Sequence, residues 1–183
     1  MSALLRFDGV ALRRGGRLLF EGLNLELGAG ERLQVTGPNG SGKSSLIRLA
    51  AGLLRAERGT VERSALALAD DHIALDRELP LGRALNFWGG RTDEAMTALG
   101  IAHLADMPVR LLSSGQLKRA TLARVAGSRA PLWLLDEPLN ALDADGTKRL
   151  GRLVERHLET GGAVVAASHQ RLGGEWRKLE LEL

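Results

Sequence analysis

The architecture of this chain follows from one segment, Gly37-Pro38-Asn39-Gly40-Ser41-Gly42-Lys43-Ser44, which fits the pattern G-x-x-x-x-G-K-S/T. The short stretch Arg32–Thr36 before it predicts a strand, and the leucines of Gly42–Leu54 recur at helical spacing. Between a strand and a helix, such a loop turns its backbone N–H groups and the positive helix end toward phosphate oxygens. A simple glycine-rich turn with a surface lysine needs neither flanking element, so the sequence predicts a phosphate-binding loop.

The loop supplies candidate ligands for a nucleoside triphosphate and its metal ion. The Lys43 ammonium can reach the β- and γ-phosphates, and the Ser44 hydroxyl can bind Mg²⁺. Ser45 follows directly and can add a phosphate contact. The residues expected to bind the nucleotide are therefore Gly37, Pro38, Asn39, Gly40, Ser41, Gly42, Lys43, Ser44 and Ser45.

Two acids follow an apolar run later in the chain. Leu132–Leu135 predicts a buried strand, and Asp136 and Glu137 come directly after it. A strand-end carboxylate such as Asp136 can hold Mg²⁺ through water, and Glu137 can orient or deprotonate an attacking water molecule. In isolation, two solvated acids after a strand are the simpler interpretation. The phosphate loop upstream and Ala141-Leu142-Asp143 downstream favour the catalytic one.

A further segment, Leu112-Ser113-Ser114-Gly115-Gln116, opens a helix predicted over Ser114–Ala126. Ser113 can supply a hydroxyl and Gly115 an unobstructed N–H at the positive end of that helix, which suits a phosphate group. A serine that only caps the helix would leave the same pattern. The segment alone therefore predicts a helix start without deciding whether a ligand binds there.

Together with a lone His169 after an apolar run, these motifs resemble those of the ATP-binding subunits of ABC transporters, over nearly the whole chain. The resemblance implies an ATPase that binds ATP and Mg²⁺ and that pairs with a second copy of itself when ATP is bound. His169 would bond the γ-phosphate, and Lys43, Glu137 and His169 would be the catalytic residues. The contacts with ATP held by the other copy would fall to Ser113, Gly115 and Gln116. Asp143 would belong to the nucleotide site as the acid that helps to couple the two sites across the dimer.

Two segments depart from the family pattern. Family members usually carry an aromatic residue near position 14 to stack on adenine; this chain has no tyrosine, and the guanidinium of Arg14 could stack instead. The family also places a glutamine after the strand expected at Leu66–Ala69, where this chain has Asp70-Asp71-His72. We expect Asp71 to supply a metal-binding oxygen and His72 a hydrogen-bond donor in its place. Two solvated loop residues are the alternative.

Alternating strands and helices predict a mainly parallel sheet. The expected fold class is α/β, that of a P-loop NTPase of the ABC type, with an N-terminal antiparallel β portion and a small helical subdomain at about residues 75–127, all within one domain, 1–183. The strands are expected at Arg32–Thr36, Leu66–Ala69, Leu132–Leu135, Ala163–Ala167 and Trp176–Leu183. The helices are expected at Gly42–Leu54, Leu81–Trp88, Thr92–Leu99, Ser114–Ala126 and Asp143–Thr160.

The gross composition is that of a globular protein. The chain has 183 residues, a hydrophobic fraction of 44%, no cysteine and a net charge of +3. Its apolar runs are much shorter than the ~20 residues that cross a bilayer. A basic surface could bind nucleic acid, but the charges are scattered rather than grouped in blocks, so we expect no nucleic-acid partner. His103 and His157 are expected to be ordinary surface residues.

Segments such as Leu85-Asn86-Phe87-Trp88 and Ser168-His169-Gln170 are similar to the ATP-binding subunit of the haem exporter of cytochrome c biogenesis. That resemblance implies integral membrane permease subunits as partners and a peripheral position on the cytoplasmic face of the inner membrane. Two other functions stay open: a soluble ABC ATPase acting on nucleic acid or ribosomes, and a nucleotide-binding regulator that does not hydrolyse ATP. Soluble ABC ATPases of that kind usually carry two cassettes, and one is seen here, which argues against the nucleic-acid function. Glu137 and His169 argue against a regulator that does not hydrolyse ATP.

Overall fold

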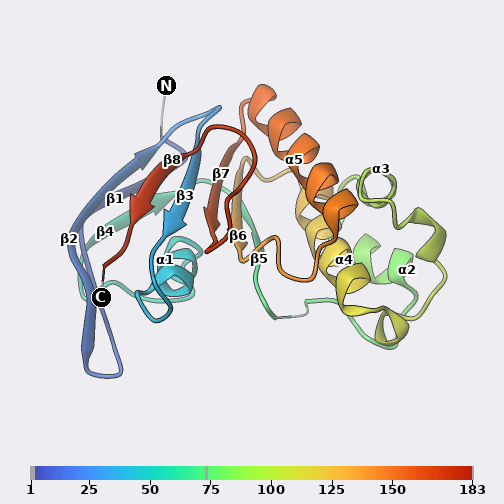
Figure 1. The fold of residues 1–183 in the computed structure, drawn as a ribbon, viewed down its shortest axis with the longest axis horizontal. Helices are drawn as coiled ribbons and strands as arrows, with labels where there is room; N and C mark the ends of the chain where they lie inside the picture. The colour runs from blue at the N-terminus through green and yellow to red at the C-terminus, as the bar shows by residue number, and fades with distance from the viewer. Residues whose placement is uncertain (1–2, 73, 183) are drawn as a thin grey trace. The chain divides into compact units, whose positions relative to one another are not determined.

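The computed structural model describes residues 3–72 and 74–182 and has an α/β fold, as predicted (Figure 1). The chain forms two compact units. The first unit comprises the residues up to Leu68, Ala130–Glu137 and the residues from His157 onward; the second comprises Ala69–Arg129 and Pro138–Arg156. The helical subdomain expected at about residues 75–127 falls within the second unit. The assignment of the whole chain to one domain stays a prediction.

The first unit contains a five-stranded sheet of order β5-β6-β7-β3-β8. Its strands are β3 (Arg32–Thr36), β5 (Leu66–Ala69), β6 (Leu132–Asp136), β7 (Ala163–Ala167) and β8 (Arg177–Glu180). The pairs β6–β7, β7–β3 and β3–β8 are all parallel. Every residue of β6 and β7 is buried, as continuous apolar runs in central parallel strands require. The predicted mainly parallel sheet is therefore confirmed.

A three-stranded antiparallel sheet of order β2-β1-β4 confirms the predicted N-terminal β portion. β1 (Leu5–Arg14) pairs with β2 (Arg17–Leu27) on one side and with β4 (Arg58–Arg63) on the other. The apolar pattern did not reveal β4, because Val61 is its only apolar residue. One core joins both sheets, and each of its buried side chains stabilises the fold by ~1.5–3 kcal/mol. This core includes Leu5, Phe7, Leu27, Leu33, Leu46, Ile47, Leu134 and Val165.

Helix α1 (Lys43–Ala50) ends earlier than its leucine spacing predicted. Gly52 adopts a left-handed conformation with φ of 78°, which stops the helix shortly after Ala50. Leu53, whose spacing predicted one helix face with Leu46 and Leu49, is therefore 61% exposed, and that prediction was wrong. Leu46 is fully buried and anchors α1 in the core. This anchoring fixes the helix whose first turn follows the phosphate loop.

The second unit is mainly helical. α2 (Leu81–Asn86), α3 (Thr92–Ala98) and α4 (Ser114–Gly127) follow one another, and most of α5 (Ala144–Glu159) belongs to this unit. Short 3₁₀ turns at Ala102–Leu104 and Val109–Leu111 connect α3 to α4. The buried side chains of the unit include Leu81, Leu85, Met96, Leu99 and Leu122.

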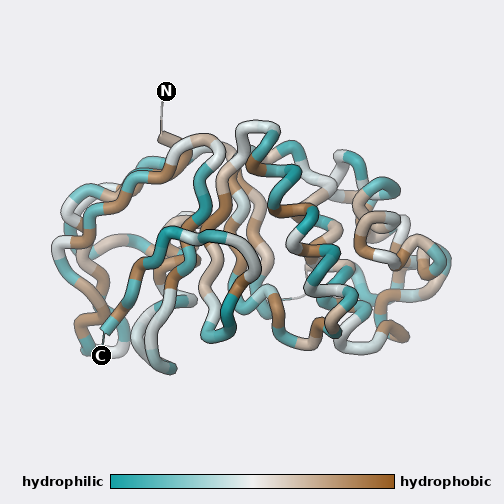
Figure 2. The backbone as a smooth tube through the Cα atoms, turned by 45° about the horizontal axis from the view of Figure 1, so that its top comes forward, coloured by the Kyte–Doolittle hydropathy of each residue, from teal (hydrophilic) through white to brown (hydrophobic). Residues whose placement is uncertain are grey.

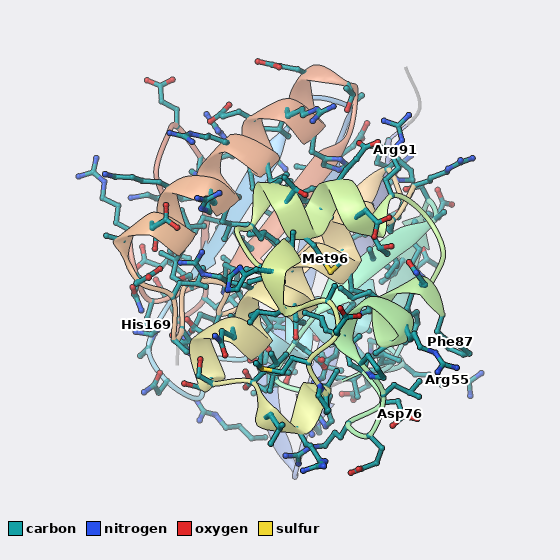
Figure 3. The ribbon with its side chains drawn as sticks, turned by 90° about the vertical axis from the view of Figure 1, so that its right-hand side faces the viewer. Arg55, Asp76, Phe87, Arg91, Met96 and His169 are labelled. Carbon is teal, nitrogen blue, oxygen red and sulfur yellow. The ribbon has the colours of Figure 1, made fainter. Side chains whose placement is uncertain are left out.

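Hydropathy separates the interior of each unit from its surface (Figure 2). In the second unit, Met96 is buried within the helices, whereas Phe87 projects outward and is 83% exposed (Figure 3). α5 carries polar residues along most of its length and buries Leu150 and Val154. Every helix within residues 3–72 and 74–182 is too short or too polar to span a bilayer.

Candidate functional site

Three neighbouring parallel strands of the first unit deliver the candidate residues to one edge of the sheet (Figure 1). The register sets Asp136 of β6 beside Ala167 of β7, and Ala167 beside Val35 of β3. The phosphate loop leaves the end of β3, Glu137 follows β6, and Ser168-His169 follows β7. Ligands of open parallel sheets bind outside the carboxyl ends of the strands, so this edge is the candidate nucleotide site.

The phosphate loop requires glycine at its first position. Gly37 has φ of 138°, and a Cβ atom there would overlap the carbonyl oxygen of Leu181 and lie 2.8 Å from Ser41 Oγ. Ser41 is itself buried, and its backbone N–H donates to the Pro38 carbonyl over 3.2 Å. The conformation of the loop is therefore fixed by its own residues and by the strand end beside it.

Lys43 and Ser44 begin α1 and carry the polar groups expected of the loop. The Lys43 side chain is mostly buried, and its Nζ donates to the carbonyl oxygens of Gly37 (2.8 Å) and Pro38 (3.0 Å). The Ser44 hydroxyl donates to Asp136 Oδ1 over 3.0 Å. A hydroxyl and a carboxylate oxygen at this distance are the hard ligands that Mg²⁺ prefers. The structure thus brings Ser44 and Asp136 together, and both fit a magnesium ion.

Glu137 and His169 form a pair beside this loop. His169 Nδ1 lies 2.9 Å from Glu137 Oε2, and the Glu137 backbone N–H donates to the Ala167 carbonyl over 2.8 Å. An ionised carboxylate only accepts hydrogen bonds, so His169 Nδ1 carries the hydrogen in this contact. The Glu137 side chain is 18% exposed and that of His169 is 55% exposed. A half-buried carboxylate oriented by an accessible imidazole can act on a water molecule at the sheet edge.

Gln34 is a candidate site residue that the sequence reasoning missed. It lies in the middle of β3 and is 4% exposed. Its side-chain Nε2 donates to the carbonyl oxygens of Gln170 (2.8 Å) and Ser168 (3.4 Å), which flank His169. A glutamine between Leu33 and Val35 in a predicted strand was the available signal, because a buried amide requires hydrogen-bond partners. Gln34 therefore fixes the segment that carries His169.

Arg14 lies at the end of β1, close to the phosphate loop. Its Nη1 donates to Ser45 Oγ over 3.3 Å, and Ser45 is buried in the first turn of α1. The guanidinium is thus held next to residues expected to bind phosphate, where it could stack on a base or pair with a phosphate oxygen. The role of Arg14 in binding adenine stays a prediction.

The second unit carries an open pocket of about 340 Å³ at the start of α4. Gln116 N–H donates to Ser113 Oγ (3.3 Å), and Ser113 N–H donates to Gln116 Oε1 (2.9 Å), which together cap the helix. The Ser113 hydroxyl accepts in this arrangement, so its own hydrogen is left to donate. The pocket is lined by Gly100, Ile101, His103, Leu104, Ser113, Gly115, Gln116, Arg119, Ala141 and Asp143. The structure therefore gathers Ser113, Gly115 and Gln116, expected to contact the other copy's ATP, with Asp143, expected to couple the two sites.

Paired charges line this pocket. Asp143 accepts from the Gly146 backbone N–H (2.8 Å) and from Arg119, and these bonds lower the pKa of its carboxyl. Hydrogen bonds from Arg149 and Arg119 likewise lower the pKa of Asp145. Burial of Arg119 opposes its charge, but its hydrogen bonds to the two aspartates outweigh that effect and raise its pKa. These groups are therefore charged at neutral pH.

In the segment after β5, Asp70 is the acid that pairs with His72. Asp70 Oδ1 accepts from the His72 backbone N–H (3.1 Å), and Asp70 Oδ2 lies 3.2 Å from His72 Nδ1. The side chain of Asp70 is 11% exposed, whereas Asp71 is exposed. The structure therefore holds His72 against Asp70 and leaves Asp71 at the surface. The assignment of Asp71 as a metal ligand stays a prediction.

His157 is not the ordinary surface residue that the sequence predicted. Its ring stacks on Trp133 with centroids 3.9 Å apart, and its Nε2 lies 3.1 Å from the Pro131 carbonyl oxygen. This burial lowers the pKa of the imidazole although the backbone contacts oppose the shift. The histidine falls near the end of an amphipathic helix, where helical periodicity does not show that β6 passes beneath it. His103 is exposed, as predicted.

Known proteins resemble this chain over almost all of its length. Residues 20–140 match the family model described as ABC transporter. The "Cytochrome c biogenesis ATP-binding export protein CcmA" of Sphingopyxis alaskensis is 53% identical over 177 residues, covering 92% of this chain and 91% of the relative. The protein of the same name from Novosphingobium aromaticivorans is 55% identical over 169 residues, covering 91% of this chain and 88% of the relative.

Solved structures share the fold at low sequence identity. A putative ABC transporter ATP-binding protein from Pyrococcus furiosus has a TM-score of 0.82 at 20% identity, covering 97% of this chain and 96% of that chain. A nucleotide-free ATP-binding cassette from an ABC transporter has a TM-score of 0.76 at 18% identity, covering 92% of this chain and 82% of that one. At these identities the likeness concerns the fold alone.

Proposed function

Since this chain belongs to the ABC transporter family, we propose that it is the ATP-hydrolysing subunit of a membrane exporter that serves cytochrome c biogenesis. The observation that carries the proposal is the convergence at one sheet edge of the phosphate loop, the Ser44–Asp136 pair and the Glu137–His169 pair. Each pair joins residues far apart in sequence, so the arrangement depends on the fold and not on one local motif.

The phosphate loop is proposed to bind the triphosphate of ATP. The backbone N–H groups of the loop and of the first turn of α1 point to the phosphate oxygens, and the positive helix end favours their charge. Lys43 exchanges its bonds to loop carbonyls for bonds to the β- and γ-phosphates, because a phosphate oxygen is the stronger acceptor for an ammonium. Binding of ATP is therefore electrostatic at its phosphate end.

Ser44 and Asp136 are proposed to hold Mg²⁺. The two oxygens already lie within hydrogen-bond distance of each other, and both are of the hard type that this ion selects. When bound, the ion would neutralise charge on the β- and γ-phosphates. The buried Asp136 contributes its oxygen from the end of β6, and Ser44 contributes its hydroxyl from the start of α1. Asp71 is proposed as a further oxygen donor from the segment after β5.

Glu137 and His169 are proposed to act on the attacking water and the γ-phosphate. The carboxylate of Glu137 orients the water or accepts its proton, a role that contributes typically ~10²–10⁴-fold to a rate. His169 Nδ1 first holds the carboxylate in place. A neutral imidazole has one N–H, so His169 can donate to the γ-phosphate only by leaving Glu137 or by carrying a second proton. Exchange between these two acceptors would link γ-phosphate binding to the release of Glu137.

The pocket of the second unit is proposed to complete the site in trans. One chain carries one phosphate loop and one segment Ser113–Gln116, so a pair of chains makes two composite sites. The helix start and the Ser113 hydroxyl are donors suited to a γ-phosphate, and Asp143 stands at the pocket rim. The proposed partners are a second copy of this chain and integral membrane permease subunits of the haem-exporter type. The proposed location is peripheral, on the cytoplasmic face of the inner membrane.

The test uses the complex purified with its membrane subunits and compares three variants. Lys43→Ala should abolish ATP turnover, and Glu137→Gln should slow turnover by ~10²–10⁴-fold while nucleotide still binds and a dimer is trapped. Glu159→Gln makes the same chemical change on the exposed end of α5 and should behave as the parent. Turnover at the parent rate in Glu137→Gln, or failure of the chain to copurify with any integral membrane protein, would contradict the proposal.

A further inference from the structure

Arg119 is a partly buried cation on the helix that Ser113 caps, and no motif assigned it a role. Its side chain is 13% exposed. Nη2 donates to Asp143 Oδ1, while Nη1 donates to Asp145 Oδ2 (3.1 Å) and to the Leu99 carbonyl (2.9 Å). One guanidinium therefore joins α4, the end of α3 and the start of α5. A planar group with several fixed donors holds such a set of acceptors in one geometry.

The loop that carries Asp143 also lies directly on the start of α4. A Cβ atom built on Gly115 would stand 2.9 Å from the carbonyl oxygen of Ala141. Ala141 adopts φ of 63°, a left-handed conformation that a non-glycine residue keeps only when its surroundings enforce it. Two independent contacts, the Gly115–Ala141 approach and the Arg119–Asp143 pair, thus hold this loop against the helix start.

We infer that Arg119 is a positioning residue, which holds Asp143 and the Ser113–Gln116 helix start as one rigid element that meets the nucleotide of the second copy. The inference rests on the proposed function, because it concerns how the trans half of that site is built. Both bonds to Asp143, from Arg119 and from the Gly146 N–H, use the Oδ1 oxygen. The carboxylate, 69% exposed, is fixed in orientation while most of its surface faces outward. Without Arg119, the loop and the helix start approach the partner independently, and dimer closure loses part of its preorganisation.

Arg149 offers a matched control in the same network. Its Nε donates to Asp145 Oδ2 (2.7 Å), and its Nη1 donates to the Ala98 carbonyl (3.1 Å). It therefore shares one aspartate and the α3 end with Arg119. The structure gives Arg149 no bond to Asp143 among the residues it describes. If Arg119 only stabilises the fold, replacing either arginine should change Tm, kcat and dimer trapping in a similar way. If Arg119 positions Asp143, only its replacement should lower kcat and dimer trapping.

The experiment places Arg119→Gln and Arg149→Gln in the assembled complex, each alone and each combined with Glu137→Gln. The measurements are kcat and KM for ATP, the fraction of ATP-trapped dimer, the nucleotide affinity of the isolated chain and its Tm. Arg119→Gln should lower kcat and the trapped fraction about tenfold, or ~1.4 kcal/mol, within the range for coupled neighbours. Nucleotide affinity should stay at the parent value, since the phosphate loop belongs to the first unit. Arg149→Gln should lower Tm and keep the parent kcat and trapped fraction.

Two further variants keep the test decisive if Arg119→Gln does not fold. Arg119→Lys keeps a charge and part of the bonding, so it should recover part of the trapped dimer. Asp143→Asn can still cap α5 but loses its charge, so it should lower the fraction of trapped dimer. In the double variant, Arg119→Lys should add little to that loss, because both changes break the same pair. Additive losses in that double variant would overturn the inference.

The remaining outcomes separate this inference from the proposed function. If Glu137→Gln alone traps no dimer, the proposed function fails and this inference fails with it. If Glu137→Gln traps a dimer that Arg119→Gln leaves intact, or if Arg149→Gln lowers kcat as much as Arg119→Gln does, only this inference is overturned.

Discussion

Adding one methyl group at Gly115 should have the opposite effect to adding one at Gly151. Both glycines lie in helices, where glycine is less stable than alanine by ~0.5–1 kcal/mol. A Cβ at Gly151 meets no atom within 4 Å, so Gly151→Ala in α5 should stabilise the chain by about that amount. A Cβ at Gly115 would lie 2.9 Å from the Ala141 carbonyl oxygen, and that oxygen belongs to backbone that cannot rotate away. Overpacking of this kind costs ~1–3 kcal/mol, which exceeds the gain in helix propensity.

Because the gain in helix propensity is common to both variants, they should differ by the overpacking cost, ~1–3 kcal/mol in the free energy of unfolding. Urea unfolding of the isolated chain, followed by circular dichroism, measures this difference directly. In thermal unfolding each kcal/mol corresponds to ~2–4 °C for a chain of this size. Gly115→Ala should also lower the fraction of dimer trapped in the Glu137→Gln background, because the displaced loop carries Asp143. If Gly115→Ala is as stable as Gly151→Ala, the close approach of the loop to α4 is refuted.

Other features of the site give shorter tests. Arg14→Ala should weaken ATP binding about fivefold or more in a fluorescent-nucleotide titration, because stacking on a base contributes ~1–3 kcal/mol. Arg14→Tyr should retain the parent affinity. Equal affinity of the parent and both variants would exclude stacking. The ATPase activity of the isolated chain should be weak and should rise in the complex with the membrane subunits. Asp71→Ala or His72→Ala should reduce that stimulation. Stimulation at the parent level in both variants would show that neither residue contributes to it. Because burial lowers the pKa of His157, the unfolded chain takes up the proton first as pH falls below ~6.5, and stability is lost in that range. His157→Phe keeps a ring on Trp133, so its urea midpoint should fall less than that of the parent between about pH 7.5 and about pH 5.5.

The centre of the parallel core could be predicted because its two middle strands are almost entirely apolar. β6 and β7 read as continuous hydrophobic runs, and each is followed by polar residues that end the strand. Since carboxyl ends of adjacent parallel strands meet at one edge, the convergence of Asp136, Glu137 and His169 follows once β6 and β7 are known to be neighbours. The order of the strands in the sequence did not reveal that β6 and β7 are neighbours; the structure shows it.

Features that depend on tertiary contacts could not be predicted from the sequence. β4 carries five non-apolar residues around Val61 and exists because β1 supplies its hydrogen bonds. The amphipathic pattern of α5 placed His157 near its polar end but could not show the ring of Trp133 beneath it. Arg119 and Asp143 are 24 residues apart, and no periodic pattern links a helix residue to a loop residue at that separation. Propensity and periodicity report local structure, and these contacts are not local.

The loop after β6 combines backbone strain with the proposed chemistry. Among the non-glycine residues in the ranges 3–72 and 74–182, positive φ is found at Glu137 (43°) and Ala141 (63°). Each such conformation costs ~1–3 kcal/mol and persists only where neighbouring groups enforce it. The Ala167 carbonyl and His169 enforce it at Glu137.

At Ala141 the enforcing contacts are the approach to Gly115 and the pair that Arg119 makes with Asp143. Glycine would relieve the strain at position 137, but it would also remove the carboxylate proposed to act on water. The chain leaves the first unit at Glu137 and enters the second at Pro138, so one short loop carries both Glu137, the partner of His169, and Asp143, which lines the pocket on α4. The strain at Glu137 and Ala141 accompanies the fixing of both carboxylates within one short loop. At each position a contact of the proposed nucleotide machinery helps to offset it, His169 at Glu137 and the Arg119–Asp143 pair at Ala141.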